Sequence, residues 1–87
     1  MGFHEATIHK GEYGQLSKIR EELEEAEDAE ARGQMLMLRI ELSDILGAVK
    51  GVSDRLGMDF NELLVFAELR SKVAREEQDE LCPGGPK

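Results

Sequence analysis

The sequence predicts an all-α protein, and three observations point to this class. Of its 87 residues, 40% are hydrophobic and 34% are charged, which is typical of a folded globular chain. β-branched residues are few, and both prolines lie within the last five residues, where they interrupt no helix. Apolar residues recur at helical spacing along most of the chain.

Three main helices are predicted, preceded by a turn-rich segment at residues 1–14 that contains Gly11 and Gly14. The first helix runs from about residue 16 to 31 and ends before Gly33; the second runs from residue 35 toward Gly57. Asp59, followed three residues later by Glu62, resembles a capping box and starts a third helix that ends near residue 79 or 80. We therefore expect a helical domain at 15–80 and a flexible tail at 81–87, where "CPGGPK" shows no periodicity.

Each helix carries one apolar stripe that predicts its packing side. The stripes consist of Leu16, Ile19, Leu23 and Ala26 in the first helix, Met35, Leu38, Leu42, Ile45, Leu46, Val49 and Val52 in the second, and Leu63, Phe66, Leu69 and Val73 in the third. Gly47 and Gly51 lie inside the second helix, where glycine lowers helix propensity, and they predict the close approach of another backbone. A chain this short buries only about 60–65% of its unfolded surface, so we expect a small helical bundle completed by a partner chain.

The charge and the missing targeting signals limit the possible partners. A net charge of −8 argues against a nucleic-acid partner, which is gripped through clustered Lys and Arg, but permits a small phosphate ligand bridged by metal ions. The first residues contain no apolar run of the kind found in signal peptides, and no stretch approaches the roughly 20 apolar residues of a membrane span. We therefore expect a cytoplasmic protein that has no membrane partner; the single Cys82 is compatible with a reducing compartment.

Acidic residues repeat in the first two helices with an offset of nineteen. In this alignment Glu22 matches Glu41 and Glu25 matches Asp44, and both pairs stand on the same side of their apolar stripes. If the helices pack through these stripes, four carboxylates converge. Like charges repel, so such a cluster favours a hard cation, and Mg²⁺ binds a few carboxylates while keeping waters and substrate phosphates as further ligands. The sequence therefore predicts a Mg²⁺ site, with Mn²⁺ as the alternative ion.

The same residues resemble a known family. "EELEE" supplies an EExxE pattern (Glu21, Glu22 and Glu25), fifteen residues separate Glu25 from Glu41, and "ELSD" supplies ExxD. Together with "KGEYGQLSKIREELEEAEDA" and "LGMDFNELL", the pattern resembles the MazG-like all-α nucleoside triphosphate pyrophosphohydrolases, in particular the compact, phage-type members, over roughly residues 9–75.

This resemblance implies Mg²⁺-dependent hydrolysis of an NTP or dNTP to the monophosphate and pyrophosphate. It implies that Glu22, Glu25, Glu41 and Asp44 are metal ligands, with Glu21 as an auxiliary carboxylate that orients water or a further metal. Basic residues would contact the substrate phosphates, and the chain offers Lys18 and, on the last helix, Arg70, Lys72 and Arg75. The family builds its site within dimers or dimers of dimers, so the resemblance also implies a homodimer or homotetramer.

Two other functions remain open from the sequence. Each acidic segment taken alone also suits a solvated helix face, since Glu favours helices and exposed positions. The chain could then be a non-catalytic oligomerisation or interaction module whose acidic face binds a basic partner. The −8 charge also suits an acidic decoy that mimics nucleic acid. Such a decoy would bind a basic protein with a steep salt dependence.

Overall fold

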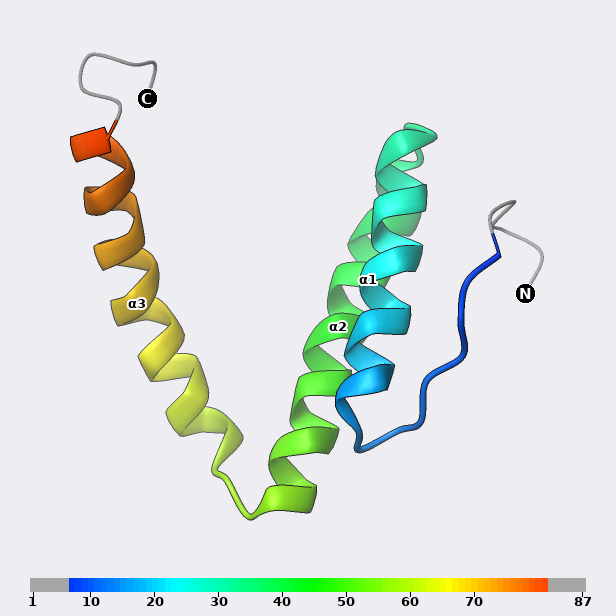
Figure 1. Ribbon diagram of the computed structural model, residues 1–87, viewed down its shortest axis with the longest axis horizontal. Coiled ribbons are helices and arrows are strands. Elements are labelled where there is room, and N and C mark those ends of the chain that lie inside the picture. Colours follow the sequence, from blue (N-terminus) through cyan, green and yellow to red (C-terminus); the bar gives the residue numbers. More distant parts are fainter. Residues whose placement is uncertain (1–6, 82–87) are drawn as a thin grey trace.

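The computed structural model describes residues 7–81 and confirms the predicted all-α fold. Its three helices are α1 (Leu16–Ala31), α2 (Met35–Leu56) and α3 (Phe60–Leu81), in chain order (Figure 1). The predicted tail at 81–87 lies outside the described residues except for Leu81, which is the last residue of α3. No helix in the described part of the chain is long and apolar enough to cross a membrane.

Local signals in the sequence set the helix ends. Gly33, two residues after the end of α1, and Gly57, directly after α2, both adopt left-handed backbone conformations, with φ of 69° and 74°. The Met58 N–H donates to the Ser53 carbonyl at 2.8 Å, which satisfies a carbonyl that the helix leaves free at its C-terminus. The Asp59 carboxylate accepts a hydrogen bond from the Asn61 N–H at 2.9 Å and so caps the start of α3, as predicted from the sequence.

The hairpin of α1 and α2 forms the packed part of the molecule. The short connection at residues 32–34 turns the chain back, so the two helices run antiparallel and side by side (Figure 1). The buried residues along their seam are mostly small, which brings the two backbones close together; the buried apolar set is Ala26, Ala29, Ala48 and Val52. The larger stripe residues Leu23, Leu42 and Leu46 lie beside this seam and remain about half exposed.

Helix α3 diverges from the hairpin after the turn at residues 57–59. It contacts α2 only near this turn, and the hairpin and α3 form the two arms of a V (Figure 1). The radius of gyration is 15.6 Å, whereas a compact domain of this length has about 12 Å. The apolar stripe of α3 is therefore not covered by the described part of its own chain.

The two glycines inside α2 have different surroundings, and the predicted approach of another backbone is present only at Gly51, whose carbonyl oxygen would lie 3.9 Å from a Cβ added to Gly14. The nearest neighbour of Gly51 is a side chain, because the Tyr13 ring lies so close that an added Cβ would be 2.8 Å from its Cζ atom. At Gly47 no described atom lies within 4 Å of an added Cβ, its own helix aside. Gly51 makes room for an aromatic ring, while Gly47 borders open space.

This difference predicts different changes in stability for two alanine substitutions in one helix. Gly47→Ala should stabilise the protein by up to about 1 kcal/mol, since alanine has the better helix propensity and meets nothing. Gly51→Ala gains the same propensity but displaces the Tyr13 ring, so it should be less stable than Gly47→Ala by roughly 1 kcal/mol. Urea unfolding followed by circular dichroism measures both changes. Because Tyr13 is the only tyrosine and the chain has no Trp, its fluorescence should change in Gly51→Ala alone. Equal stabilisation by both substitutions would contradict the packing of Tyr13.

Candidate metal centre

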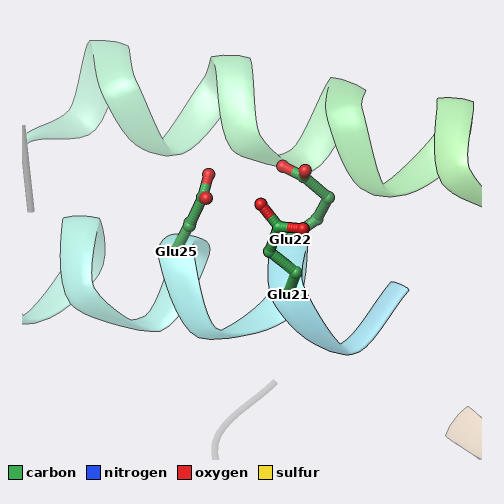
Figure 2. A group of neighbouring side chains, drawn as sticks. All are labelled: Glu21, Glu22 and Glu25. Atoms are coloured by element: carbon green, nitrogen blue, oxygen red, sulfur yellow. The ribbon is translucent and has the colours of Figure 1, made fainter. Parts of the chain in front are cut away.

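The five acidic residues singled out in the sequence lie together between α1 and α2. One carboxylate oxygen each from Glu22, Glu41 and Asp44 can be chosen so that all three lie within 4.8 Å of one another. The same holds for Glu21, Glu22 and Glu25, whose side chains point from α1 toward α2 (Figure 2). Glu25 also shares a side-chain hydrogen bond with Glu41 across the two helices. The convergence expected from the matching phase of the two helices is thus present in the structure.

The cluster is buried at its centre and open at one side. Glu21, Glu22 and Glu41 are 4%, 5% and 4% exposed, whereas Asp44 is exposed. Buried carboxylates are costly in free energy unless hydrogen bonds or positive charges compensate them. The surroundings of each carboxylate therefore show whether the chain itself supplies that compensation.

Glu21 is compensated by its own chain. Its Oε1 accepts a hydrogen bond from the Gly11 N–H at 2.8 Å and one from Lys18 Nζ at 3.2 Å, and Lys10 Nζ lies 3.8 Å from its Oε2. Burial alone would raise the pKa of Glu21, but the Gly11 hydrogen bond and the two lysines hold this pKa below its usual value. Glu21 fastens the N-terminal segment to α1 and stays ionised.

Glu22 is compensated only in part. Its Oε2 forms an ion pair with Lys18 Nζ at 2.9 Å, and this contact raises the pKa of Lys18 despite the lysine's own burial. Its Oε1 is buried and accepts no hydrogen bond from any described residue. A buried carboxylate oxygen without a donor is a position where a cation would be stabilising.

Glu25 responds to the cluster by holding a proton. Burial, the hydrogen bond with Glu41 and the negative charges of Glu22, Glu41 and Glu21 together raise the pKa of Glu25 to about 7. Near neutral pH this residue is therefore partly protonated, which reduces the repulsion within the cluster. The cluster binds positive charge in two forms, the Lys18 ammonium and this proton.

The ligand chemistry of the cluster suits a hard divalent cation. Every predicted ligand is a carboxylate, no sulfur or imidazole lies among them, and oxygen-only sets favour Mg²⁺ or Mn²⁺ over softer metals. Glu22, Glu25, Glu41 and Asp44 are the residues that could hold such an ion, with the Oε1 atom of Glu22 among their oxygens. These residues fit the metal that the sequence predicts.

A cavity of about 320 Å³ opens beside the carboxylates. It is lined by Glu22 and Asp44 from the cluster, by Lys18, and by Tyr13 and Gly47. Gly47, Ser43 and Ala48 also line this cavity, and the acidic motifs in the sequence do not point to them. A glycine in mid-helix, facing the same way as Asp44 three residues earlier, was the available signal for this cavity.

The basic residues proposed as phosphate contacts fall into two groups. Lys18 lies at the cluster, between Glu21 and Glu22 and at the edge of the cavity. Arg70, Lys72 and Arg75 are exposed on α3, the arm that diverges from the hairpin, and do not line the cavity beside the carboxylates. Of these four basic residues, only Lys18 lines the cavity beside the carboxylates in the described part of a single chain.

The site also depends on glycine at position 11, where the backbone N–H donates to Glu21. A Cβ added there would overlap the Ser17 carbonyl, which belongs to the first turn of α1 and cannot move aside alone. We expect Gly11→Ala to shift the N-terminal segment, break the Gly11–Glu21 hydrogen bond and cost about 1–3 kcal/mol of folding free energy. Thermal unfolding measures the loss, and His9→Ala, a change at an exposed residue of the same segment, is the control. An unchanged melting temperature in Gly11→Ala would show that Glu21 is not held in this way.

Comparisons with protein-family models, with curated proteins and with solved structures found no match to this chain.

Proposed function

We propose that this protein is a Mg²⁺-dependent nucleotide pyrophosphohydrolase that converts an NTP or dNTP and water to the nucleoside monophosphate and pyrophosphate. The observation that carries the proposal is the buried acidic cluster, in which the Oε1 atom of Glu22 lacks a donor, next to a cavity that is open to solvent. The resemblance of EExxE and ExxD to the MazG-like enzymes supports the same reaction.

In this proposal Glu22, Glu25, Glu41 and Asp44 hold the metal. When bound, Mg²⁺ supplies positive charge for the phosphoryl oxygens and lowers the pKa of a coordinated water. No nucleophilic side chain is required, since water attacks phosphorus and the bond between the α-phosphoryl group and the pyrophosphate oxygen breaks. The polar residues that line the cavity are the carboxylates Glu22 and Asp44, one lysine, one tyrosine and one serine.

Lys18 has a second role in this proposal. Its ammonium is paired with Glu22, and the same side chain lines the cavity where the phosphates would lie. A cation that binds Glu22 weakens the hold of this carboxylate on Lys18, because the two positive charges compete for the same oxygens. Lys18 is then available to a phosphate group, so that metal and substrate binding favour each other.

The cavity also suggests where the nucleoside lies. The Tyr13 ring is largely exposed although one face rests on Gly51, and a base can stack on an exposed aromatic face. Gly47 leaves space between this ring and Asp44. We therefore place the base near Tyr13 and the phosphates near Lys18 and the carboxylates.

A product assay tests the proposal directly. The purified protein is incubated with a panel of canonical and modified NTPs and dNTPs and Mg²⁺, and monophosphate, diphosphate, pyrophosphate and phosphate are resolved separately. We expect monophosphate and pyrophosphate in equal amounts, with no turnover in EDTA. Release of diphosphate and phosphate would point to a different bond being cleaved. Absence of turnover across the panel, with no rise in melting temperature on adding Mg²⁺, would favour the non-catalytic interaction module.

A further inference from the structure

Tyr13, which borders the cavity beside the carboxylates, lies on a turn rather than on a helix. The Gln15 N–H donates to the Glu12 carbonyl at 3.0 Å and closes a β-turn in which Tyr13 and Gly14 are the two central residues. Gly14 has a φ of 89°, the positive value that a type II turn requires at this position. Because segments outside helices move more easily than helices do, the place of the Tyr13 ring depends on what holds this turn.

Helix α1 holds the turn on its N-terminal side. The Glu12 N–H donates to Ser17 Oγ at 3.1 Å, and the Gly11 N–H donates to Glu21 Oε1 at 2.8 Å. Both acceptors lie in the first two turns of α1, alongside which the preceding segment runs (Figure 1). These two hydrogen bonds fix the backbone directly before Tyr13.

Helix α2 holds the turn on its other side, through Arg55. The Nε–H group of Arg55 donates to the Gly14 carbonyl, 41 positions away in the sequence. Gly14 is buried against α2, where a Cβ added to it would lie 3.9 Å from the Gly51 carbonyl oxygen. A buried carbonyl needs a donor, and a charged guanidinium makes a stronger hydrogen bond than a neutral group does. Arg55 therefore fixes the backbone directly after Tyr13.

The Tyr13 ring depends on these backbone contacts because its own packing is slight. One face of the ring rests on Gly51, yet the residue is 67% exposed. Gly51 and Arg55 are four residues apart and lie on the same face of α2, so the ring and the Gly14 carbonyl meet neighbouring positions of one helix. Loss of the Arg55 hydrogen bond would therefore free the ring before it disturbed the helices.

We propose that Arg55 is a positioning residue of the nucleotide site, which holds Gly14 and so keeps the exposed Tyr13 ring at the edge of the cavity, where a base stacks on it. The inference rests on the proposed function for the nature of the ligand. Among the described residues, Arg55 belongs neither to the carboxylate groups nor to the lining of the cavity, so it acts through Tyr13 and not by contact with substrate. A ring that is fixed before binding loses less conformational entropy when the base arrives.

The two ends of the cavity should respond differently to the loss of Arg55. The phosphate end is formed by Lys18, Glu22 and Asp44, which α1 and α2 place directly, whereas the base end is formed by Tyr13 on its turn. Arg55→Met keeps the aliphatic part of the side chain and removes the donor. Because Arg55 is exposed, this substitution leaves the core packing intact. We therefore expect it to weaken contacts with the base and to spare contacts with the phosphates.

Tyrosine fluorescence tests the role of Arg55 without any ligand. Tyr13 is the only tyrosine and the chain has no Trp, so the anisotropy of the emission reports the mobility of this one ring. We expect a lower anisotropy in Arg55→Met than in the wild type, and recovery in Arg55→Lys, which keeps a donor. Arg39→Met makes the same change at another exposed position of α2, outside the lining of this cavity, and should keep the wild-type anisotropy. Equal anisotropy in Arg55→Met and the wild type would overturn the proposal.

Calorimetric titration in Mg²⁺ separates the base end of the cavity from the phosphate end. The probes are inorganic tripolyphosphate and the α,β-imido analogues of dATP and dCTP, which keep the triphosphate but resist cleavage at the proposed bond. Arg55→Met should bind the analogues about tenfold more weakly, the size of one aromatic contact, and should bind tripolyphosphate as tightly as the wild type does. In turnover the same variant should raise KM and leave kcat unchanged. An unchanged affinity for the analogues, or an equal loss of affinity for all three probes, would overturn the positioning role.

The two experiments also distinguish this inference from the proposed function. A wild type that binds none of the three probes and turns over no nucleotide would overturn the proposed function. The anisotropy comparison would still decide whether Arg55 holds Tyr13, because it requires neither metal nor nucleotide. The positioning role and the proposed reaction can therefore fail separately.

Discussion

Asp44→Asn should lower kcat/KM of the pyrophosphohydrolase reaction roughly 100-fold or more, because the metal would lose a ligand that helps to neutralise charge in the transition state. Asp44 is the most informative member of the cluster because it is exposed, so its substitution leaves packing intact. Glu41→Gln should cause a similar loss of activity. Steady-state kinetics with pyrophosphate release as the signal measures both variants.

Asp54→Asn is the matched control for this experiment. It makes the same change on the same helix, but Asp54 is exposed, pairs with Lys50 at 3.2 Å and lies outside both carboxylate groups. Its activity should equal that of the wild type. Wild-type activity in both Asp44→Asn and Glu41→Gln would disprove the metal role. If Glu41→Gln raised the melting temperature equally with and without Mg²⁺, the carboxylates would serve only as an acidic surface.

The apo protein should lose stability as the pH rises from about 5 to 8. The pKa of Glu25 is raised to about 7 in the folded state, and that of an unfolded Glu lies near 4.5, so the folded state binds this proton more tightly. The stabilisation is complete below the unfolded pKa and disappears as the pH rises through about 7. It amounts to at most about 3 kcal/mol. Urea unfolding in EDTA at a series of pH values measures the slope.

Glu25→Gln should remove most of this slope and stabilise the apo protein at pH 8, since it replaces a repelled carboxylate with a neutral amide. Glu24→Gln alters the neighbouring carboxylate, which belongs to neither group of the cluster, and should keep the slope. Adding Mg²⁺ to the wild type should restore stability mainly above pH 7, where Glu25 no longer holds the proton with which the metal competes. A wild-type apo protein with no pH dependence in this range would show that Glu25 does not couple to the cluster.

The charge compensation of each carboxylate depends on the other carboxylates of the cluster. Glu21 is satisfied by Gly11 and Lys18, while Glu22 shares Lys18 and keeps one oxygen without a donor. Glu25 then holds a proton for part of the time. The cluster is tolerated without metal because one lysine and one proton offset much of its charge, and a divalent cation could replace both.

Local chemistry made the helices predictable from the sequence. Glycine is the residue that most readily adopts the left-handed conformation after a helix, so Gly33 and Gly57 marked the ends of α1 and α2. Asp59 marked the start of α3 for an equally local reason, since its side chain caps the first turn. The meeting of Glu22 with Glu41 and Asp44 followed from their matching phase and from the short connection between the two helices.

Only the tertiary structure decided what lies against each surface. Hydrophobic periodicity shows that a face avoids water but not what covers it, so it did not indicate that Ala29 and Ala48 would form the seam or that α3 would diverge from the hairpin. The contacts of Tyr13 with Gly51 and of Gly11 with Glu21 join residues far apart in the chain, and no spacing rule connects them. The sequence by itself determined the helices and the phase of their carboxylates, because both depend on neighbours within a few residues. The compensation of the buried charges and the exposed face of α3 depend on long-range packing, which only the folded chain defines.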